Sequence, residues 1–440
     1  ESCSPNTNKP LHLGHLRNIL LGHAVANILV ADGHKVTRVQ IINDRGIHIC
    51  KSMLAWIKFG EGETPSKCKM KGDYFVGKYY VLFEQKYQEE QKSLVNQGHS
   101  VESAQQNSII LNEAKELLRK WESGDKSTLD LWKQMNTWVY EGFESTYKKI
   151  GVSFDKNYYE SDTYLIGKEY VLDGVNSGVF YQKTDSSIWA DLESRNLDNK
   201  LLLRSDGTAV YMTQDLGTAI VRYDELMFDK MIYVVGNEQN HHFNVLFSIL
   251  SKMGKSWSSN LHHLSYGMVN LPDGKMKSRE GTVIDIDDLL EEMYEKSKSI
   301  MLNSSKIDPE DIEELSTIVG DSALKYFILK PDAKKNILFN PEESIDFNGH
   351  TGPFIQYTYA RIQSILKKTD SFNRTFRVSR SLLEEERILI HLILNYPLTI
   401  RQASLSLNPA ILANYLYTLS KEYNHFYQKI PILNPEDKSD

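Results

Sequence analysis

Apolar residues recur along the chain with two different periods. Across residues 11–33 they recur at helical intervals, and Gly33 is a suitable residue to end that helix. In residues 35–42 polar residues alternate with β-branched apolar ones, which predicts a strand that ends at Asn43 and Asp44. A helix followed directly by an apolar strand is typical of a parallel α/β sheet.

The pattern changes twice more along the chain. Residues 60–147 are rich in Lys, Glu and Gln and carry long helical patterns, which predicts a helical insertion. The α/β pattern then returns, and beyond residue 286 the chain is helical to its end without a strong strand signal. This order predicts an α/β fold, a Rossmann-type parallel sheet with a helical insertion, followed by an all-α domain. The elements expected after the insertion are strands at 178–181, 201–203 and 209–212, a helix at 215–226 and a strand at 230–235.

Composition excludes some classes of protein. The chain has no apolar run of about 18 residues, which predicts no membrane span, and its first residues do not resemble a signal peptide. Cys3, Cys50 and Cys68 lie far apart, which argues against a disulfide scaffold or a cysteine-rich zinc site and suits a cytoplasmic protein. A net charge of -7 argues against a protein that simply coats nucleic acid, but it allows a local basic face on a large enzyme.

The first candidate motif lies where the first helix begins. His12 and His15 are separated by about one helical turn, so both side chains point the same way at a helix N-terminus, where main-chain N–H groups favour anions. Gly14 between them lets a flat base approach the backbone. A chance surface pair is the ordinary interpretation of such spacing. A metal pair is a poor alternative, because no third ligand is nearby.

The second candidate motif is a basic segment between two glycines, residues 274–283. Its lysines and arginine suit a polyphosphate, although such a segment alone is more often a solvated turn. Paired with the first motif in a Rossmann-like pattern, it is far more specific.

Together the two motifs resemble the HIGH and KMSKS signatures of class I aminoacyl-tRNA synthetases, and the chain resembles the arginyl-tRNA synthetase family most closely. The resemblance covers essentially the whole chain in family order. Further strings that carry it are residues 1–6 (ESCSPN), 154–161 (FDKNYYES), 205–215 (SDGTAVYMTQD), 228–234 (FDKMIYV) and 349–357 (GHTGPFIQY).

The resemblance implies an ATP site built from both motifs. It assigns phosphate stabilisation to His12 and His15, and neutralisation of the leaving pyrophosphate, with Mg²⁺, to Lys9 and Lys275. Ser278 stands where the family's second loop lysine would be, and Lys9 would replace that charge. No zinc is expected. The remaining ATP-binding residues would be Gly14, Gly267, Met268, Val269, Met276, Ser278 and Arg279.

Arginine recognition requires carboxylates in matched geometry, because the guanidinium is planar, permanently charged and rich in donors. The resemblance places Glu160, Tyr211 and Asp215 at the guanidinium, and Asn6 and Gln239 at the α-amino and α-carboxylate groups. The ordinary alternatives are a helix N-cap for Asp215, a solvated carboxylate for Glu160 and a core strand tyrosine for Tyr211.

The last third of the chain carries the predicted contact with tRNA(Arg). Phe354 and Tyr357 are candidates to stack on unpaired bases, and Lys367 and Lys368 begin a basic run that continues to residue 380 and suits phosphates. The alternatives are a core role for the aromatic residues and a solvated face for the basic ones.

The resemblance also predicts how the chain divides. We expect the anticodon-binding domain to be cut short and the protein to be a cytoplasmic monomer that uses ATP, L-arginine and tRNA. The expected segments are the first half of the catalytic domain at 1–60, the mainly helical insertion at 61–160, a small β-containing insertion at 161–202, the second half with the basic loop at 203–290, a helical stem-contacting region at 291–345 and the helical anticodon-binding domain at 346–440.

Two other functions remain open at this stage. One is a class I synthetase for another amino acid, such as glutamate or cysteine, although paired carboxylates favour a cationic substrate. The other is a non-catalytic tRNA-binding relative, which would have no use for His12, His15, Lys9 and Lys275.

Overall fold

A computed structural model describes residues 1–270, 284–302, 309–368 and 381–432. The chain divides into two compact units. The first comprises Glu1–Ile19, Thr37–Tyr266 and Met276–Ile286, and the second comprises Leu20–Val36, Gly267–Lys275 and Asp287–Asp440. Helix α1 (Leu13–Ala31) contributes to both.

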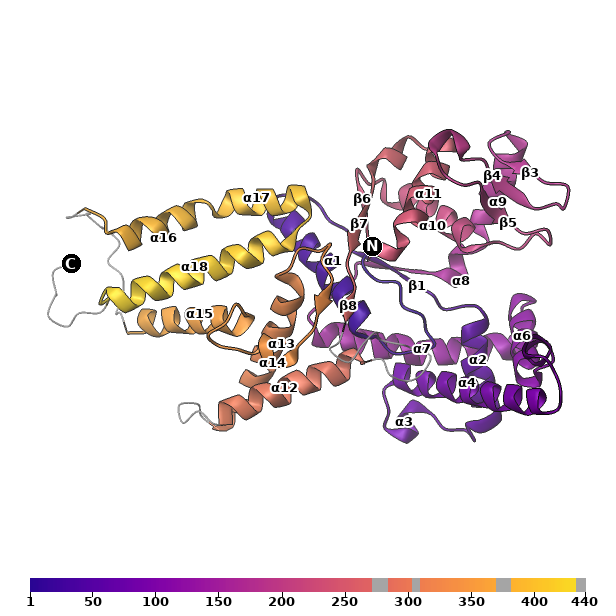
Figure 1. The fold of residues 1–440 in the computed structure, drawn as a ribbon, viewed down its shortest axis with the longest axis horizontal. Helices are drawn as coiled ribbons and strands as arrows, with labels where there is room; N and C mark the ends of the chain where they lie inside the picture. Colours follow the sequence, from indigo (N-terminus) through magenta and orange to yellow (C-terminus); the bar gives the residue numbers. More distant parts are fainter. Residues whose placement is uncertain (271–283, 303–308, 369–380, 433–440) are drawn as a thin grey trace. The chain divides into compact units, whose positions relative to one another are not determined.

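A parallel sheet organises the first unit. Strand β1 (Val39–Ile42) pairs with β2 (Lys156–Tyr159), and β6 (Met231–Gly236) pairs with β7 (Leu261–Tyr266), both in parallel (Figure 1). The first residues of the chain join the two pairs. The main chain of residues 2–5 is hydrogen-bonded to residues 39–43, while Glu1 is bonded to residues 232 and 234. The spatial order is therefore β2, β1, residues 1–5, β6, β7, which confirms the predicted Rossmann-type sheet.

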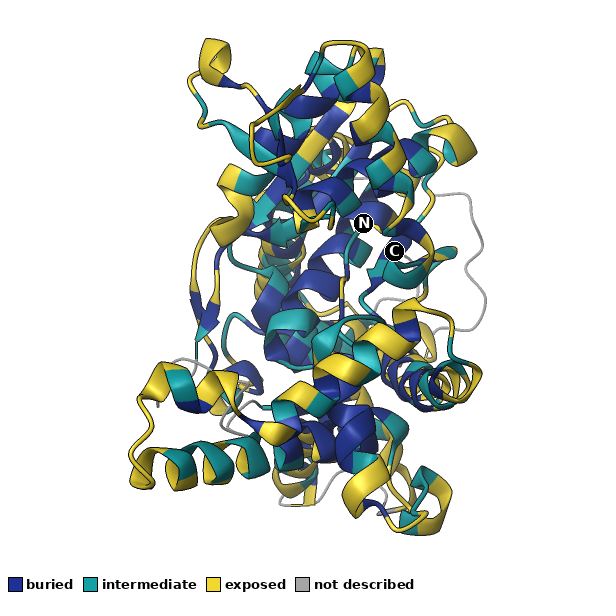
Figure 2. Cartoon of the chain, turned by 90° about the vertical axis from the view of Figure 1, so that its right-hand side faces the viewer, coloured by how far each residue is buried: buried dark blue, intermediate teal, exposed yellow. Residues whose placement is uncertain are grey.

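The sheet is accompanied by the helices of the first unit and by a small antiparallel sheet of β3 (Tyr181–Gln182), β4 (Ile188–Ala190) and β5 (Lys200–Leu203). One apolar core includes β1, β6, α10 and α11. The faces of the helices that point away from the core are exposed (Figure 2). The helices are α2 (Ile47–Phe59), α3 (Pro65–Cys68), α4 (Gly72–Asn96), α5 (Val101–Gln106), α6 (Ile109–Glu122), α7 (Lys126–Lys149), α8 (Glu160–Thr163), α9 (Ile166–Asn176), α10 (Tyr211–Leu226) and α11 (Asn240–Lys252).

The strand predicted at residues 209–212 is wrong. Tyr211 begins α10, and Ala209 forms only an isolated bridge to Leu203. Its apolar run is too short to distinguish a strand from the buried first turn of a helix by pattern alone.

The second unit is mainly helical, but it is not free of strands. Strand β8 (Val269–Asn270) pairs in parallel with β9 (Ile337–Leu338), so the prediction of an entirely helical chain beyond residue 286 is wrong at β9. These strands have only two residues each, too few to leave a periodic signal. The helices are α12 (Ile286–Leu302), α13 (Ile312–Leu329), α14 (Pro341–Ser344), α15 (Gly352–Leu366), α16 (Glu384–Leu394), α17 (Tyr396–Ser406) and α18 (Pro409–Lys429).

Hydrogen bonds tie the helices of the second unit together. The hydroxyl of Tyr326 in α13 donates to the carbonyl oxygen of Ala413 in α18 at 2.9 Å. Arg401 in α17 binds Asp32, just after α1, with 2.8 Å between Nη1 and Oδ2. Gly33 ends α1 with a φ of 90°, as the sequence predicts. No helix among the described residues is both long and apolar enough to cross a bilayer.

Candidate active site

Helix α1 begins at the first motif, where each of the two histidines accepts a hydrogen bond from a main-chain N–H group. The N–H of His12 donates to Nδ1 of His15 at 3.1 Å, and the N–H of Gly14 donates to Nδ1 of His12 at 3.2 Å. The rings lie against each other, with centroids 3.9 Å apart. Because Nδ1 accepts in both rings, the remaining proton of each neutral imidazole is on Nε2.

Burial keeps both imidazoles neutral. Desolvation, with Lys9 adding to it, lowers the pKa of His12 to about 4. Desolvation and the neighbouring His12 and Lys9 lower the pKa of His15 well below its usual range. Burial also lowers the pKa of Lys9. The motif therefore presents two uncharged N–H donors close to the charged group of Lys9.

Gly14 leaves room for the ring of His12, and the approach of a base at this glycine stays a prediction. A Cβ on Gly14 would lie 3.0 Å from Cε1 of His12, so the imidazole folds over the glycine. Gly77 has a comparable role on α4, where a Cβ would lie 2.9 Å from Cδ of Pro10. The two glycines thus allow the ring of His12 and helix α4 to pack closely against the first motif.

The chain that follows the second motif is bonded to the first motif. The N–H of Leu13 donates to the carbonyl oxygen of Ile284 at 3.2 Å, and the N–H of Ile286 donates to that of Leu11 at 3.0 Å. His12 and Asp285 form an antiparallel bridge. The residues that directly follow the basic segment are therefore held at the first histidine. The predicted residues Lys275, Met276, Ser278 and Arg279 lie outside the described residues.

Much of the main chain predicted to hold adenine already has partners. The N–H of Gly267 donates to the carbonyl oxygen of Ala333 at 2.9 Å, and that of Met268 donates to the side chain of Asn336 at 2.8 Å. The carbonyl oxygen of Met268 accepts from β9. The next residue, Val269, directs its N–H and C=O to the opposite side of β8, because successive residues of a strand alternate.

Glu160 follows β2 directly and is held by the loop that follows β1. Asp44 accepts hydrogen bonds from the N–H of Ser161 at 2.9 Å and from its hydroxyl at 2.8 Å. The Glu160 side chain is only 13% exposed. Burial raises the pKa of Glu160 to about 7; the guanidinium of Arg45 opposes the rise, and Asp44 and Asp215 add to it. Glu160 is therefore a buried carboxyl group beside other acids, and not the solvated carboxylate of the alternative interpretation.

Asp215 and Tyr211 lie on α10. Asp215 is paired with His242 of α11, with 2.6 Å between Oδ2 and Nε2, and its side chain is 42% exposed. Tyr211 is 76% exposed, which excludes the alternative of a core strand tyrosine. Asp215 lies inside α10, so it is not the N-cap of the alternative interpretation. The negative charge of Asp215 is one of the causes that raise the pKa of Glu160.

A buried ion pair fixes α10 to the sheet. Arg222 binds Glu1 with 2.5 Å between Nη2 and Oε2, and its guanidinium lies 4.8 Å from the centre of the Tyr158 ring. On the other side α10 packs against α9 at two glycines. A Cβ on Gly167 would lie 1.8 Å from the carbonyl oxygen of Thr213. These contacts set the position of Asp215.

Asn6 and Gln239 also follow sheet strands. Asn6 is half-buried and bridges Asn43 in parallel, while Gln239 is exposed in a short 3₁₀ turn (Asn237–Gln239) directly after β6. Asn6, Glu160, Gln239 and the first motif thus all follow carboxyl ends of strands in one parallel sheet, where such folds place their ligands.

The sequence analysis missed three residues that shape this site. Asp44 was taken only as the end of a strand, and Arg45 and Glu1 were given no role. The signal for Asp44 and Arg45 was their position, since polar residues that directly follow a buried parallel strand lie at the ligand-binding edge. The pairing of Glu1 with Arg222 is a long-range contact without a local pattern.

In the second unit the predicted tRNA-binding residues lie on and just after α15. Phe354 is half-buried against Tyr417, with ring centroids 5.4 Å apart, as the alternative of a core role expected. Tyr357 is 51% exposed, and Arg361 lies over its ring. Lys367 and Lys368 are exposed.

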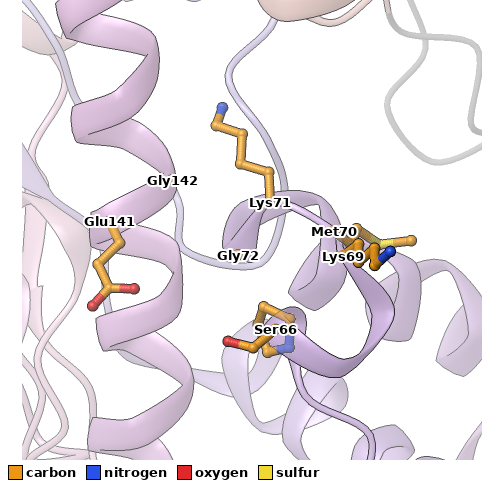
Figure 3. A pocket seen from close by; sticks show the side chains of 8 residues that line it. Ser66, Lys69, Met70, Lys71, Gly72, Glu141 and Gly142 are labelled. Atoms are coloured by element: carbon orange, nitrogen blue, oxygen red, sulfur yellow. The ribbon is translucent and has the colours of Figure 1, made fainter.

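A separate cavity of about 410 Å³ lies in the helical insertion (Figure 3). It is lined by residues of α3, α7, the start of α4 and the connection between α3 and α4, among them Ser66, Lys71 and Glu141, and it includes none of the predicted site residues. Lys71 is paired with the buried Asp73, with 3.1 Å between Nζ and Oδ2. In the part of the chain that the structure describes, no group of three or more His, Cys, Asp or Glu side chains is arranged to hold a metal ion.

Comparison with known proteins identifies the family. A family model described as tRNA synthetases class I (R), catalytic domain, matches residues 1–340, and a DALR anticodon binding domain model matches residues 355–440. An arginine–tRNA ligase of Bacteroides fragilis is 55% identical over 445 residues, covering 100% of this chain and 74% of the relative. The chain belongs to the arginyl-tRNA synthetase family.

Other arginyl-tRNA synthetases agree in sequence and fold. The arginine–tRNA ligase of Flavobacterium psychrophilum is 56% identical over 441 residues, covering 99% of this chain and 73% of the relative. The solved arginyl-tRNA synthetase of Thermus thermophilus has a TM-score of 0.80 at 24% identity, covering 98% of this chain and 75% of that one. The latter likeness concerns the fold, an α/β catalytic domain followed by a helical one.

Proposed function

We propose that this arginine–tRNA ligase carries out both of its steps at the carboxyl edge of the parallel sheet. In the first step a carboxylate oxygen of arginine attacks the α-phosphorus of ATP, a P–O bond forms to give arginyl-adenylate, and pyrophosphate leaves. In the second step a hydroxyl at the 3′ end of tRNA takes the arginyl group and AMP leaves. The observation that carries the proposal is the bridge between His12 and Asp285, since it holds the chain that follows the second motif against the first.

The ATP end of the site would work by charge compensation. His12 and His15 would donate through Nε2 to phosphate oxygens, and preorganised donors of this kind stabilise charge that develops in the transition state. Lys9 and Lys275 would neutralise the leaving pyrophosphate, with Met276, Ser278 and Arg279 contributing from the same segment. Gly267, Met268 and Val269 would hold the adenine, and among them Val269 has main-chain groups directed away from β9.

Two acidic side chains would recognise the arginine substrate. Glu160 and Asp215 would receive the guanidinium, with the exposed Tyr211 beside them, while Asn6 and Gln239 would hold the α-amino and α-carboxylate groups. A neutral side chain would leave two carboxylates without a partner, which is costly in a partly buried site.

ATP requires a divalent cation in this proposal. Mg²⁺ is commonly held through substrate phosphates and water, with few protein ligands. The described residues fit that mode, because they offer no acidic cluster that would form a dedicated cage.

The helical domain would bind tRNA(Arg), using the exposed Tyr357, Lys367 and Lys368, with Phe354 supporting α15 from its inner side. A cytoplasmic monomer with the segment boundaries given above is part of the same proposal.

Neither alternative function is favoured. The curated relatives named above are arginine–tRNA ligases, not synthetases for glutamate or cysteine. A non-catalytic relative would not need two half-buried, uncharged histidines that share one helix end.

Pyrophosphate exchange with each of the twenty amino acids, with and without tRNA(Arg), tests the proposal. We expect exchange with arginine and none above background with lysine or neutral amino acids. Exchange specific for another amino acid, or none with arginine when tRNA is present, would contradict it.

A further inference from the structure

Arg45 lies beside the carboxyl group that is proposed to receive the substrate, although the sequence gave it no role. It follows Asp44 in the loop after β1, and its guanidinium Nη1 lies 3.9 Å from Oε1 of Glu160. Its side chain is 11% exposed. The chain therefore keeps an arginine of its own at the site where an arginine would bind.

Local connections fix the relative position of Arg45 and Glu160. The two follow neighbouring parallel strands, with Ile42 of β1 in register with Tyr159 of β2. The residues next to them are joined directly, since Asp44 accepts two hydrogen bonds from Ser161. Asp44 also accepts from the hydroxyl of Tyr140 in α7 at 3.0 Å. Neither Arg45 nor Glu160 can move far without breaking this connection.

The guanidinium of Arg45 has other partners that a substrate would not displace. Its Nη2 lies 3.1 Å from Oε1 of Glu122 at the end of α6. Its carbon Cζ lies 3.8 Å from the centre of the Tyr164 ring and 5.4 Å from that of Trp121. A guanidinium held by a carboxylate and two aromatic rings stays in place when a second guanidinium arrives.

We propose that Arg45 is a positioning residue for the substrate arginine: its guanidinium lies beside Oε1 of Glu160, favours the ionised form of that carboxyl group and leaves Oε2 for the substrate guanidinium. The inference rests on the proposed function of Glu160. Two guanidinium groups can share the site because acids outnumber them. The charged and titratable groups around Glu160 are Asp44 and Arg45 from the loop after β1, Glu122 of α6, Asp215 of α10 and, through Asp215, His242 of α11.

The variant Arg45→Met tests the inference, since methionine keeps an unbranched chain for the aromatic rings and removes the charge. We expect the KM for arginine in pyrophosphate exchange to rise by about tenfold, the scale of one charge-assisted contact, while the KM for ATP stays unchanged. The acid limb of kcat/KM for arginine moves to higher pH, because Glu160 loses the neighbouring charge that favours its ionised form. Arg45→Lys keeps that charge, so its acid limb stays near the wild-type position.

The matched control is Arg38→Met. Arg38 lies just before β1, at the opposite end of the strand from Arg45, and pairs with Asp155. We expect this variant to leave both the KM for arginine and the acid limb unchanged. A rise equal to that in Arg45→Met would mean that the loss of any arginine along β1 weakens the site, and would overturn the inference.

A double-mutant cycle with Glu160→Gln decides whether Arg45 acts through Glu160. We expect Arg45→Met to add no further rise in the KM for arginine once Glu160 is replaced. An equal rise in both backgrounds, no rise in either, or a fall that marks Arg45 as a competitor of the substrate would each overturn the inference. If the methionine variant does not fold, Arg45→Gln, which also removes the charge, takes its place in the cycle.

The single variant Glu160→Gln separates this inference from the proposed function. A wild-type KM for arginine in Glu160→Gln would remove Glu160 from the site, and the proposed function of that residue would fail together with the inference. A raised KM in Glu160→Gln with an unaffected Arg45→Met would overturn the inference alone.

Discussion

The main-chain N–H of His12 donates to Nδ1 of His15 across 3.1 Å. This bond fixes the tautomer of His15, and the equivalent bond from Gly14 fixes that of His12. The sequence suggested that the free N–H groups of the helix end would themselves attract phosphate. In the structure the imidazoles accept two main-chain N–H groups there, those of His12 and Gly14, and their Nε2–H groups remain as donors.

The variant His15→Ala removes one such donor. We expect arginine-dependent pyrophosphate exchange to fall by about 10² to 10³-fold, the scale for loss of one donor to a transition state. His34→Ala is the control, because His34 lies beyond the end of α1 with a largely exposed side chain. Wild-type exchange by the His15 variant, measured with tRNA present, would exclude the proposed role.

The pH dependence should differ between the two substrates. Because the pKa values of His12 and His15 lie far below neutrality, both rings stay uncharged from pH 6 to 8, and the KM for ATP should not change through them. Glu160 has a pKa of about 7, so its carboxylate forms, and kcat/KM for arginine increases, as the pH rises through that value.

Steady-state kinetics from pH 6 to 8 checks this difference. A KM for ATP that worsens with a midpoint near 6.5 as the histidines lose a proton would show that they act as cations. A flat profile for arginine would show that Glu160 does not bind it in the ionised form.

The variant Asp215→Asn keeps the shape of the side chain and removes its charge. We expect the KM for arginine to rise by about 10- to 100-fold, because the guanidinium loses one charged partner, and the KM for ATP to stay close to wild type. Asp224→Asn, on an exposed position of the same helix, is the control and should change neither. An unchanged KM for arginine in Asp215→Asn would remove this residue from the site.

The variant Gly167→Ala should destabilise the catalytic unit. A Cβ at this position meets the carbonyl oxygen of Thr213 at 1.8 Å, so α9 and α10 must separate, at a cost of about 1–3 kcal/mol or more. Gly254→Ala is the control: its φ is 73°, but a Cβ there meets no atom within 4 Å, so only a backbone cost of about 1 kcal/mol is expected. Urea denaturation of both variants measures the difference, and equal midpoints would contradict the packing account.

The double variant Lys367→Ala and Lys368→Ala should weaken tRNA(Arg) binding. Two fewer phosphate contacts reduce the slope of log affinity against log salt concentration by about 1.4 to 1.8. Lys120→Ala, on the exposed end of α6, serves as the control. Filter binding across a salt series measures this slope. An unchanged slope would show that the two lysines after α15 do not contact phosphates.

Local patterns predicted the elements that have enough length. Helix α1, its stop at Gly33 and the buried strand β6 were all predicted closely, because each carries a repeated apolar period and a clear end signal. The strand predicted at residues 209–212 was wrong, and β9 was missed, because both segments are too short to show a period.

The candidate site was predictable only in part. The family strings predict Glu160 and Asp215 as site residues, but the contact of Arg45 with Glu160 joins elements distant in sequence. Arg45 contacts α6 and α8 only once the insertion has folded back against β1. No local spacing in the sequence predicts that contact.

A structure with a non-reactive analogue of arginyl-adenylate tests the central claim most directly. The account predicts that the guanidinium of the analogue lies within ion-pair distance of Glu160 and Asp215, and that the group replacing the phosphate lies within hydrogen-bond distance of Nε2 of His12 or His15. An analogue whose guanidinium faces solvent, or whose phosphate mimic is remote from both histidines, would contradict it.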